Sequence, residues 1–365
     1  MALQCGIIGL TNAGKTTIFN CISNTRGEIH AFAFTGAKSN LGIVQVPDPR
    51  LYEIEKHQVT EKIVPTTVEI VDIPGLTKGS GKSEGGGNKF LGDIRNTDAL
   101  IHVLRCFDNE TLPHIDGSVD PVRDIETIDL ELQVRDIESI EKKIDRLRKA
   151  SKVGDKDSMH GLDVLARYHQ HLEGFNSAGT LKVKDDERRY IDDLFLLTMK
   201  PVMYVCNVDE ESAVNGNHHT ERVKDFLKGK NAEILIIAGA LEAEIAELEN
   251  KEDRLSFLKD AGLDEPGVDK LVRAAYRLLN LQTFFTAGPK EIRAWTIRKG
   301  MTASQAAGII HSDLERGFIR AEVMKYNDFI TLGSEHACKE AGKFHVEGKN
   351  YIVGDGDILF IRFNV

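Results

Sequence analysis

Long apolar runs, an excess of basic residues and paired cysteines are all missing from this 365-residue sequence. No stretch approaches the roughly 18 uninterrupted apolar residues of a membrane-spanning helix, so we expect no membrane protein. The 57 Asp and Glu residues outnumber the 47 Lys and Arg residues, and the resulting net charge of -10 argues against a generally basic, nucleic-acid-binding surface. The five cysteines are scattered and form no C-x-x-C pair, which predicts reduced, buried thiols in the cytoplasm, without zinc or disulfides.

Length and composition are typical of a globular protein with more than one domain. Apolar residues make up 41% of the chain and charged residues 28%. At roughly 100–200 residues per domain, two or three domains are expected. The first residues carry no basic segment ahead of an apolar run, so we predict no signal peptide and a cytoplasmic location.

Short apolar runs separated by helical patterns occur through most of the first 280 residues. They cover Gln4–Gly9, Thr67–Asp72, Ala99–Phe107, Pro201–Asn207 and Glu233–Ala238. Apolar strands that alternate with helices are typical of a mostly parallel sheet covered on both faces. We therefore predict an α/β domain formed by residues 1–128 and 197–280.

Between Asp129 and Phe175 the apolar residues recur instead at spacings of three and four. Two such series flank a polar turn: Ile137, Ile140, Ile144 and Leu147, then Leu162, Leu165, Tyr168 and Leu172. This pattern predicts an antiparallel hairpin of amphipathic helices. Because strand-like runs resume after Leu194, we interpret residues 129–196 as an inserted helical arm. The alternative is an ordinary surface helix pair in a larger bundle.

From about Leu281 the sequence contains short β-rich runs punctuated by glycine, with one helical segment at Thr302–His311. We predict a compact β-rich module over residues 281–365. It holds 11 Lys and Arg residues against 10 Asp and Glu residues, so it is the least acidic part of the chain. This balance makes the module the better candidate for contacting RNA.

Residues Gly9–Thr16 match the phosphate-loop pattern G-x-x-x-x-G-K-S/T at every fixed position. The match follows a predicted strand and opens a predicted helix, which is the context that the motif requires. The glycines let backbone N–H groups surround phosphates, Lys15 reaches the β- and γ-phosphates, and the Thr16 hydroxyl ligates Mg²⁺. We predict that the nucleotide contacts this loop through Asn12, Ala13, Gly14, Lys15, Thr16 and Thr17.

A second element of the site is Asp72-Ile73-Pro74-Gly75, at the end of a predicted strand. An aspartate there can hold the water shell of Mg²⁺, and the Gly75 N–H can sense the γ-phosphate. The next residue is Leu76, where Ras-like enzymes place a glutamine that orients water. Leucine forms no hydrogen bond, so another group must position the attacking water.

The tetrapeptide Asn207-Val208-Asp209-Glu210 follows an apolar strand, in the place where GTPases carry N-K-x-D. The acid at the last position recognises guanine, and the longer Glu210 fits guanine poorly. An amide such as that of Asn207 suits N6 and N7 of adenine. The base preference therefore leans to adenine, with a plain surface turn as the alternative reading of the tetrapeptide.

Taken in order, these landmarks resemble the YchF/Obg-like ATPase family, and the resemblance covers the whole chain. Further marks are Pro47-Asp48-Pro49-Arg50, Gly87–Leu91, Gly239–Glu242, Phe284–Gly288, Gly317–Val323 and Arg362–Val365. The family implies an OBG-type nucleotide domain, an inserted coiled-coil arm and a C-terminal β-grasp-like TGS module. It also implies Mg²⁺-dependent hydrolysis of ATP to ADP, weaker GTP binding, and association with the large ribosomal subunit and its RNA.

The same resemblance implies roles for further residues. His114, in a loop, matches a histidine thought to replace the missing glutamine, so we count it with Lys15 and Gly75 as catalytic. Asn12 matches an asparagine linked to K⁺, which we include as an additional ion. The nucleotide-binding residues further along the chain are Asn207, Val208, Glu210, Gly239, Ala240 and Leu241.

One segment departs from the family pattern. In Ala33–Asn40 the aligned threonine is replaced by Gly36, with Thr35 one place earlier. We assign Thr35 to Mg²⁺ together with Thr16 and Asp72, although the replacement leaves the contacts of this loop open.

The leading hypothesis is a monomeric, ribosome-associated ATPase that hydrolyses ATP slowly and acts as a conformational switch in translation or the stress response. Three alternatives remain at this stage. The phosphate loop also permits a small-molecule kinase, although no Arg-rich lid is evident. Leu76 and Gly36 permit a non-hydrolysing, nucleotide-dependent ribosome- or RNA-binding module. A GTPase is the third.

Overall fold

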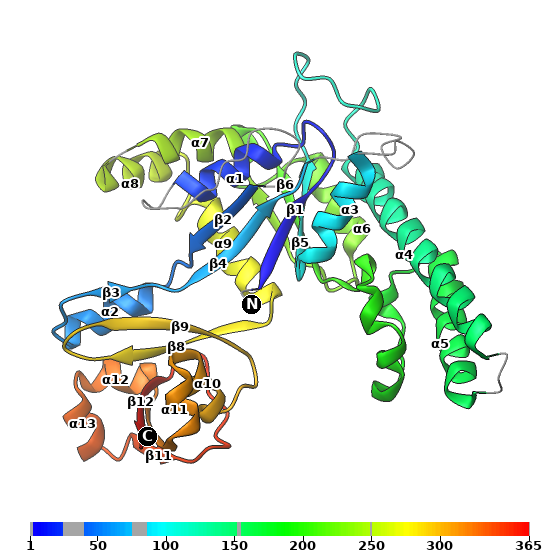
Figure 1. Cartoon of the computed structure of the whole chain (residues 1–365). Coiled ribbons are helices and arrows are strands. Elements are labelled where there is room, and N and C mark those ends of the chain that lie inside the picture. The colour runs from blue at the N-terminus through cyan, green and yellow to red at the C-terminus, as the bar shows by residue number, and fades with distance from the viewer. Residues whose placement is uncertain (1–2, 25–39, 75–85, 152–154, 249, 365) are drawn as a thin grey trace. The chain divides into compact units, whose positions relative to one another are not determined.

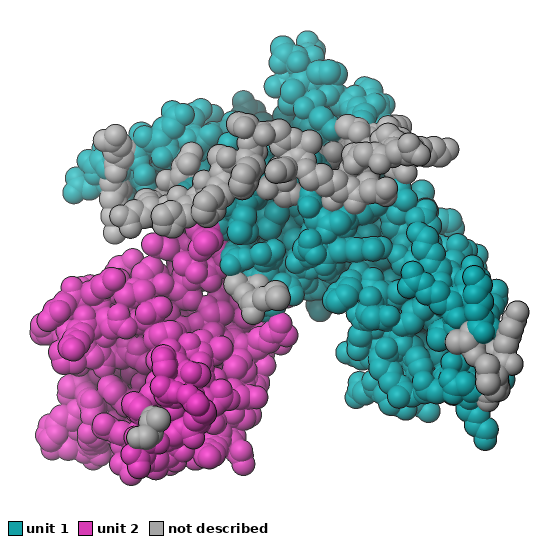
Figure 2. Space-filling model, in the orientation of Figure 1, with its two compact units in different colours: residues 1–42, 69–271 teal, residues 43–68, 272–365 magenta. Residues whose placement is uncertain are grey.

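The computed structural model describes residues 3–24, 40–74, 86–151, 155–248 and 250–364 (Figure 1). Two compact units are present (Figure 2). Unit 1 comprises residues 1–42 and 69–271, and unit 2 comprises residues 43–68 and 272–365.

Unit 1 is built on a six-stranded sheet with the order β2-β4-β1-β5-β6-β7. Its strands are β1 (Gln4–Ile8), β2 (Asn40–Gln45), β4 (Thr67–Asp72), β5 (Ala99–Arg105), β6 (Val202–Asn207) and β7 (Ile234–Ile237). β1 pairs in parallel with β4 and β5, and β6 pairs in parallel with β5 and β7. Every residue of β5 is buried, as expected of a central strand in a covered parallel sheet. The predicted α/β fold with a mostly parallel sheet is confirmed.

The helices that pack with this sheet are α1 (Lys15–Asn24), α3 (Gly86–Asn96), α6 (His218–Leu227), α7 (Gly239–Glu247) and α8 (Lys251–Asp260). Helix α9 (Gly267–Leu278) begins in unit 1 and ends in unit 2. A short 3-10 helix, η6 (Glu210–Ser212), follows β6. In a parallel arrangement the carboxyl ends of β1, β4, β5, β6 and β7 meet at one edge of the sheet. The chain segments that leave those ends are therefore brought together there.

The predicted helical hairpin is also confirmed, with α4 (Pro121–Ser151) and α5 (Lys156–Glu173) as its two helices. A buried cluster that includes Ile140, Leu165 and Tyr168 holds them together. The first helix begins earlier than the expected Asp129, because Ile128 and Leu132 pack into the core of unit 1. The chain returns to β6 through short 3-10 helices: η2 (Ala178–Thr180), η3 (Asp185–Tyr190), η4 (Asp192–Leu194) and η5 (Leu197–Met199).

Unit 2 contains a second, mixed sheet with the order β11-β10-β12-β8-β9-β3. Its strands are β3 (Ile63–Val64), β8 (Leu281–Ala287), β9 (Ile292–Arg298), β10 (Phe318–Met324), β11 (Phe344–Glu347) and β12 (Ile358–Phe363). Its helices are α2 (Pro49–His57), α10 (Ala303–Ile310), α11 (Ser312–Arg316), α12 (Tyr326–Leu332) and α13 (Glu335–Glu340). The expected β-rich C-terminal module with helices is thus present.

These units divide the chain differently from the boundaries expected from the sequence. The helical arm falls within unit 1, and residues 43–68 fall within unit 2. The physical reason is that Leu51 and Ile54 of α2 are buried against Phe285 and Phe329, while β3 pairs in parallel with β9. An amphipathic helix and a short strand early in the chain therefore complete the second core.

All five cysteines are buried, and none of them forms a disulfide. Within the described residues, no helix combines the length and the apolar character needed to cross a membrane.

Candidate nucleotide-binding site

The loop between β1 and α1 has a backbone conformation suited to surrounding an anion. Gly9, Asn12 and Gly14 have φ angles of 152°, 65° and 93°. A Cβ atom on Gly14 would lie 2.1 Å from Nδ2 of Asn207, and one on Gly9 would lie 2.4 Å from the carbonyl oxygen of Val103. Backbone conformation and lack of space therefore both require glycine at these two positions.

Lys15 opens α1 and is buried, with 7% of its surface exposed. Its Nζ donates a hydrogen bond to the carbonyl oxygen of Leu10, at 2.8 Å. Burial lowers the pKa of Lys15 to about 8, and attraction to Asp72 opposes this shift only in part. The ammonium group thus sits within the phosphate loop in a poorly hydrated position, where an anionic partner would stabilise its charge.

Thr16 and Asp72 form the part of the site that fits Mg²⁺. Thr16 Oγ1 donates to Asp72 Oδ2 at 3.0 Å, and burial raises the pKa of Asp72. The other carboxylate oxygen of Asp72 is buried and has no hydrogen-bond partner within the described residues. A hydroxyl group beside an unsatisfied carboxylate oxygen is a donor set of the hard oxygen type that Mg²⁺ takes. Thr35, Gly36, Gly75 and Leu76 lie outside the described residues.

The side-chain amide of Asn207 is engaged at both ends inside the protein. Its Nδ2 donates to the carbonyl oxygen of Ala13 at 2.9 Å, and its Oδ1 accepts from the N–H of Gly239 at 2.9 Å. The side chain is buried, and a Cβ on Gly239 would approach Oδ1 to 2.9 Å. In this arrangement the amide joins the phosphate loop to the start of α7, so it is not directed at a base as the sequence had led us to expect.

A pocket of about 620 Å³ lies at this edge of the sheet. All the nucleotide-binding residues predicted from the sequence line it, except Ala13 and Leu241. Leu241 is instead buried in a hydrophobic cluster that also contains Val208. Ala13 contributes its carbonyl oxygen to Asn207.

The sequence motifs did not assign several of the lining residues to the nucleotide: Phe107, Asp108, Asn109, Leu112 and Asp209. Four of them follow the carboxyl end of β5, and the rule that ligands bind at the carboxyl ends of parallel strands could have found them. Arg105 fixes their backbone by donating to the carbonyl oxygens of Phe107, Asn109 and Leu112.

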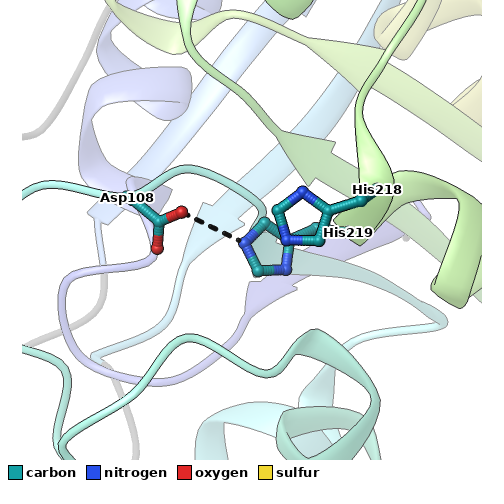
Figure 3. Close-up of side chains that lie close together, drawn as sticks. All are labelled: Asp108, His218 and His219. Carbon is teal, nitrogen blue, oxygen red and sulfur yellow. Dashed lines mark ion pairs between the residues drawn. The ribbon is translucent and has the colours of Figure 1, made fainter.

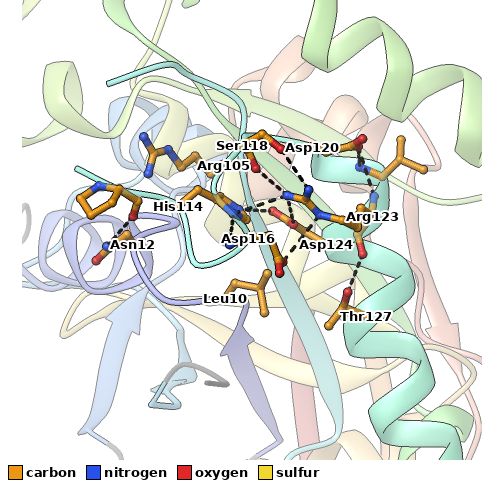
Figure 4. A network of polar contacts seen from close by, with 12 residues as sticks. Leu10, Asn12, Arg105, His114, Asp116, Ser118, Asp120, Arg123, Asp124 and Thr127 are labelled. Atoms are coloured by element: carbon orange, nitrogen blue, oxygen red, sulfur yellow. Dashed lines mark hydrogen bonds and ion pairs between the residues drawn. The ribbon is translucent and has the colours of Figure 1, made fainter. Parts of the chain in front are cut away.

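His114 lies in the segment between β5 and α4 and is buried rather than exposed. Its Nδ1 accepts from the N–H of Asp116 at 3.1 Å, and its Nε2 lies 3.0 Å from Oδ2 of Asp124 (Figure 4). This pattern places the ring proton on Nε2, donated to Asp124. Arg123 completes the network, with Nε 3.6 Å from Asp116 and Nη2 3.6 Å from Asp124.

The network is connected to the phosphate loop, although His114 does not line the pocket. Asn12 Nδ2 donates to the carbonyl oxygen of Pro113 at 3.2 Å, next to His114. This hydrogen bond therefore joins the phosphate loop directly to the segment that carries His114.

A parallel sheet, a strand–phosphate loop–helix unit at the carboxyl edge, and a Thr16–Asp72 pair beside a buried lysine together define a P-loop NTPase. Comparisons with known proteins agree. A family model described as a 50S ribosome-binding GTPase matches residues 4–152, and a model for the C-terminal domain of YchF GTPases, described as a protein of unknown function, matches residues 281–364.

Full-length relatives give the family. Proteins named ribosome-binding ATPase YchF from Haemophilus ducreyi, Bacillus subtilis and Escherichia coli O157:H7 are 47%, 45% and 45% identical, with all of this chain and all of each relative covered. The solved Schizosaccharomyces pombe YchF GTPase is 32% identical, with a TM-score of 0.86 over 99% of this chain and 97% of that one. The chain belongs to the YchF family.

The position of Asn207 generates a prediction about base selectivity. Replacing it by Ala removes two buried hydrogen bonds of about 1 kcal/mol each and leaves their partners unsatisfied, so ATP and GTP should both bind about 10- to 100-fold more weakly. Calorimetric titration with each nucleotide measures the effect, with Asn176→Ala in the arm as the control for the same chemical change. A selective loss of ATP affinity would instead mean that this amide contacts the base.

Lys15 generates a prediction about pH. Its pKa is about 8 without nucleotide, and a bound triphosphate should raise it, so binding near pH 8.5 should take up a proton. Affinity should accordingly fall as the pH rises through 8, because the neutral amine must be protonated first. Calorimetry in buffers of different ionisation enthalpy reports the uptake, with pH 6.5 as the internal control. Constant affinity between pH 7 and 9.5 would contradict this picture.

Proposed function

We propose that this chain binds ATP in the pocket at the phosphate loop and hydrolyses it slowly to ADP and phosphate while associated with the ribosome. The observation that carries the proposal is the buried Lys15 within a glycine-dependent loop, next to the Thr16–Asp72 pair. The relatives named ribosome-binding ATPase, similar over their full length, support both the nucleotide and the partner. A role as a conformational switch in translation or the stress response is part of the same proposal.

Phosphate binding is assigned to the backbone N–H groups of residues 12–17, the N-terminus of α1 and the Lys15 ammonium group. Thr16 and Asp72 would hold Mg²⁺, which when bound neutralises charge on the β- and γ-phosphates. K⁺ beside Asn12 remains an additional proposal, as does the contribution of Thr35 and of the Gly75 N–H.

Base selection has to use groups other than the engaged amide of Asn207. Phe107 is half-buried at the pocket wall and offers an aromatic ring for stacking. Glu210, which follows β6, is an exposed residue of the pocket lining. It stands where GTPases carry the shorter aspartate that recognises guanine. The replacement by Glu210 favours ATP over GTP in our proposal, whereas Phe107 would stack on either purine.

His114 is proposed as the group that orients or deprotonates the attacking water. In the arrangement described above, its ring proton is donated to Asp124 and its Nδ1 accepts from the backbone. Its catalytic use therefore requires the segment between β5 and α4 to shift, and the Asn12–Pro113 hydrogen bond links that segment to the phosphate loop. Nucleotide binding would in this way release the histidine.

Single-turnover hydrolysis of ATP and GTP, with and without ribosomes, tests the proposal. His114→Ala should slow hydrolysis by about 100- to 10,000-fold, the usual contribution of a general acid or base, with little change in ATP affinity. His336→Ala, at an exposed position in unit 2, is the matched control. Because Ala leaves Asp124 without its partner, thermal unfolding is measured alongside and His114→Gln serves as a second variant.

The outcomes separate the candidate functions. Faster turnover and tighter binding of GTP would overturn the base assignment. No turnover under any condition, with nucleotide-dependent ribosome binding intact, would favour the non-hydrolysing module.

The arm offers the best-supported contact with ribosomal RNA. Residues 142–149 contain five basic residues and one acidic residue, Asp145, in an otherwise acidic chain. Lys142, Arg146 and Lys149 are exposed on the second half of α4. A local basic surface attracts the phosphate backbone even when the net charge of the protein is negative.

Reversing these three charges, as Lys142→Glu, Arg146→Glu and Lys149→Glu, should lower cosedimentation with ribosomes at least tenfold and flatten its salt dependence. The variant should hydrolyse ATP at its basal rate. The matched control reverses three exposed charges of unit 2: Lys290→Glu, Arg298→Glu and Lys349→Glu. If the control variant no longer cosediments with ribosomes and the arm variant still does, the contact belongs to unit 2, which the charge balance of the sequence favours.

A further inference from the structure

Asp108, His218 and His219 lie together beside the nucleotide pocket (Figure 3). Asp108 follows the carboxyl end of β5, and the two histidines are the first residues of α6. Oδ2 of Asp108 is 3.6 Å from Nε2 of His219, and the two imidazole rings have centroids 3.8 Å apart. One potential ligand atom from each residue lies within 4.8 Å of the others.

His219 is unusual because its ring is buried without a hydrogen-bond partner among the described residues and has only the 3.6 Å ion pair to Asp108. Only 4% of its surface is exposed, and neither Nδ1 nor Nε2 has a hydrogen-bond partner within the described residues. Buried polar groups nearly always have such a partner, so this ring calls for an explanation. Burial, with a smaller effect of the neighbouring His218, lowers the pKa of His219, in the direction that favours the neutral form that binds metal ions.

We propose that Asp108, His218 and His219 form a binding site for a divalent transition-metal ion of the zinc class, with solvent completing the coordination. Two imidazole nitrogens and one carboxylate oxygen are a donor set that Zn²⁺ prefers and Mg²⁺ does not. Coordination at about 2.0–2.2 Å requires the three atoms to move closer together. Asp108 and His218 are exposed and can turn toward the buried His219, which serves as the anchor.

Among the described residues, a second cluster of this kind is formed by His114, Asp116 and Asp124, but its histidine has no ring nitrogen left for a metal ion. Both ring nitrogens of His114 are already engaged, and the Arg123 guanidinium supplies positive charge to both carboxylates. A metal ion there would have to displace an arginine and break two hydrogen bonds. His114 is therefore a control position for metal binding.

A metal ion at the proposed site would act on the wall of the nucleotide pocket. Asp108 lines that pocket, and the first turn of α6 is already attached to the end of β5, because Asn217 Nδ2 donates to the carbonyl oxygen of Cys106 at 2.7 Å. The ion would add a second attachment between the same two segments. The scattered cysteines argued against zinc, but this site uses none of them.

Titration of the untagged, full-length, chelator-treated protein with ZnCl₂ by calorimetry tests the proposal. We expect one tightly bound equivalent per chain, a rise in thermal unfolding temperature with Zn²⁺, and visible absorption bands of tetrahedral or five-coordinate Co²⁺ when CoCl₂ is used instead. Asp108→Asn, His218→Ala and His219→Gln should each weaken Zn²⁺ binding at least tenfold and abolish the Co²⁺ bands.

His114→Ala and His336→Ala are the matched controls and should bind Zn²⁺ as the unmodified chain does. His219→Gln alters a buried residue, so Asp108→Asn and His218→Ala, both at exposed positions, keep the test decisive if that variant unfolds. Absence of a one-equivalent binding event would overturn the proposal. So would binding that survives both exposed substitutions or is lost in His114→Ala.

Discussion

The buried amide of Asn207 is the interaction on which the geometry of the pocket depends. It joins the ends of three strands, because it lies at the end of β6 and contacts the loop after β1 and the first residue of α7 after β7. Gly14 and Gly239 have to lack a Cβ atom for this amide to fit. The same contact thus accounts for one glycine of the phosphate loop, Gly14, and for Gly239 at the start of α7, and it occupies both ends of the amide.

A second constraint concerns the segment between β5 and α4. Arg105 holds its first half through three carbonyl oxygens, Asn12 contacts Pro113, and Asp124 holds His114. Asp108, at the start of the same segment, faces the two histidines of α6. The segment that forms this wall of the pocket therefore contacts the phosphate loop, the arm helix and α6, each through different residues.

The arm helix is continuous with this network. α4 has 31 residues, which corresponds to about 46 Å at 1.5 Å per residue. Arg123 and Asp124, which contact His114, belong to its first turn, and the exposed basic residues lie on its second half. One unbroken helix therefore connects the histidine network to the surface that we propose for ribosomal RNA.

Local patterns in the sequence determined the phosphate loop, the parallel sheet and the helical hairpin, because a motif and a hydrophobic period depend on neighbouring residues. The membership of the YchF family could be recognised from the same motifs. Tertiary structure alone decided that α2 and β3 complete the second core, that Asn207 holds the phosphate loop, that His114 is buried against Asp124, and that Asp108 meets His219. Each of these features depends on which surfaces pack together and on which buried groups then lack a hydrogen-bond partner. The residues involved are far apart in the chain, so no local pattern in the sequence contains this information.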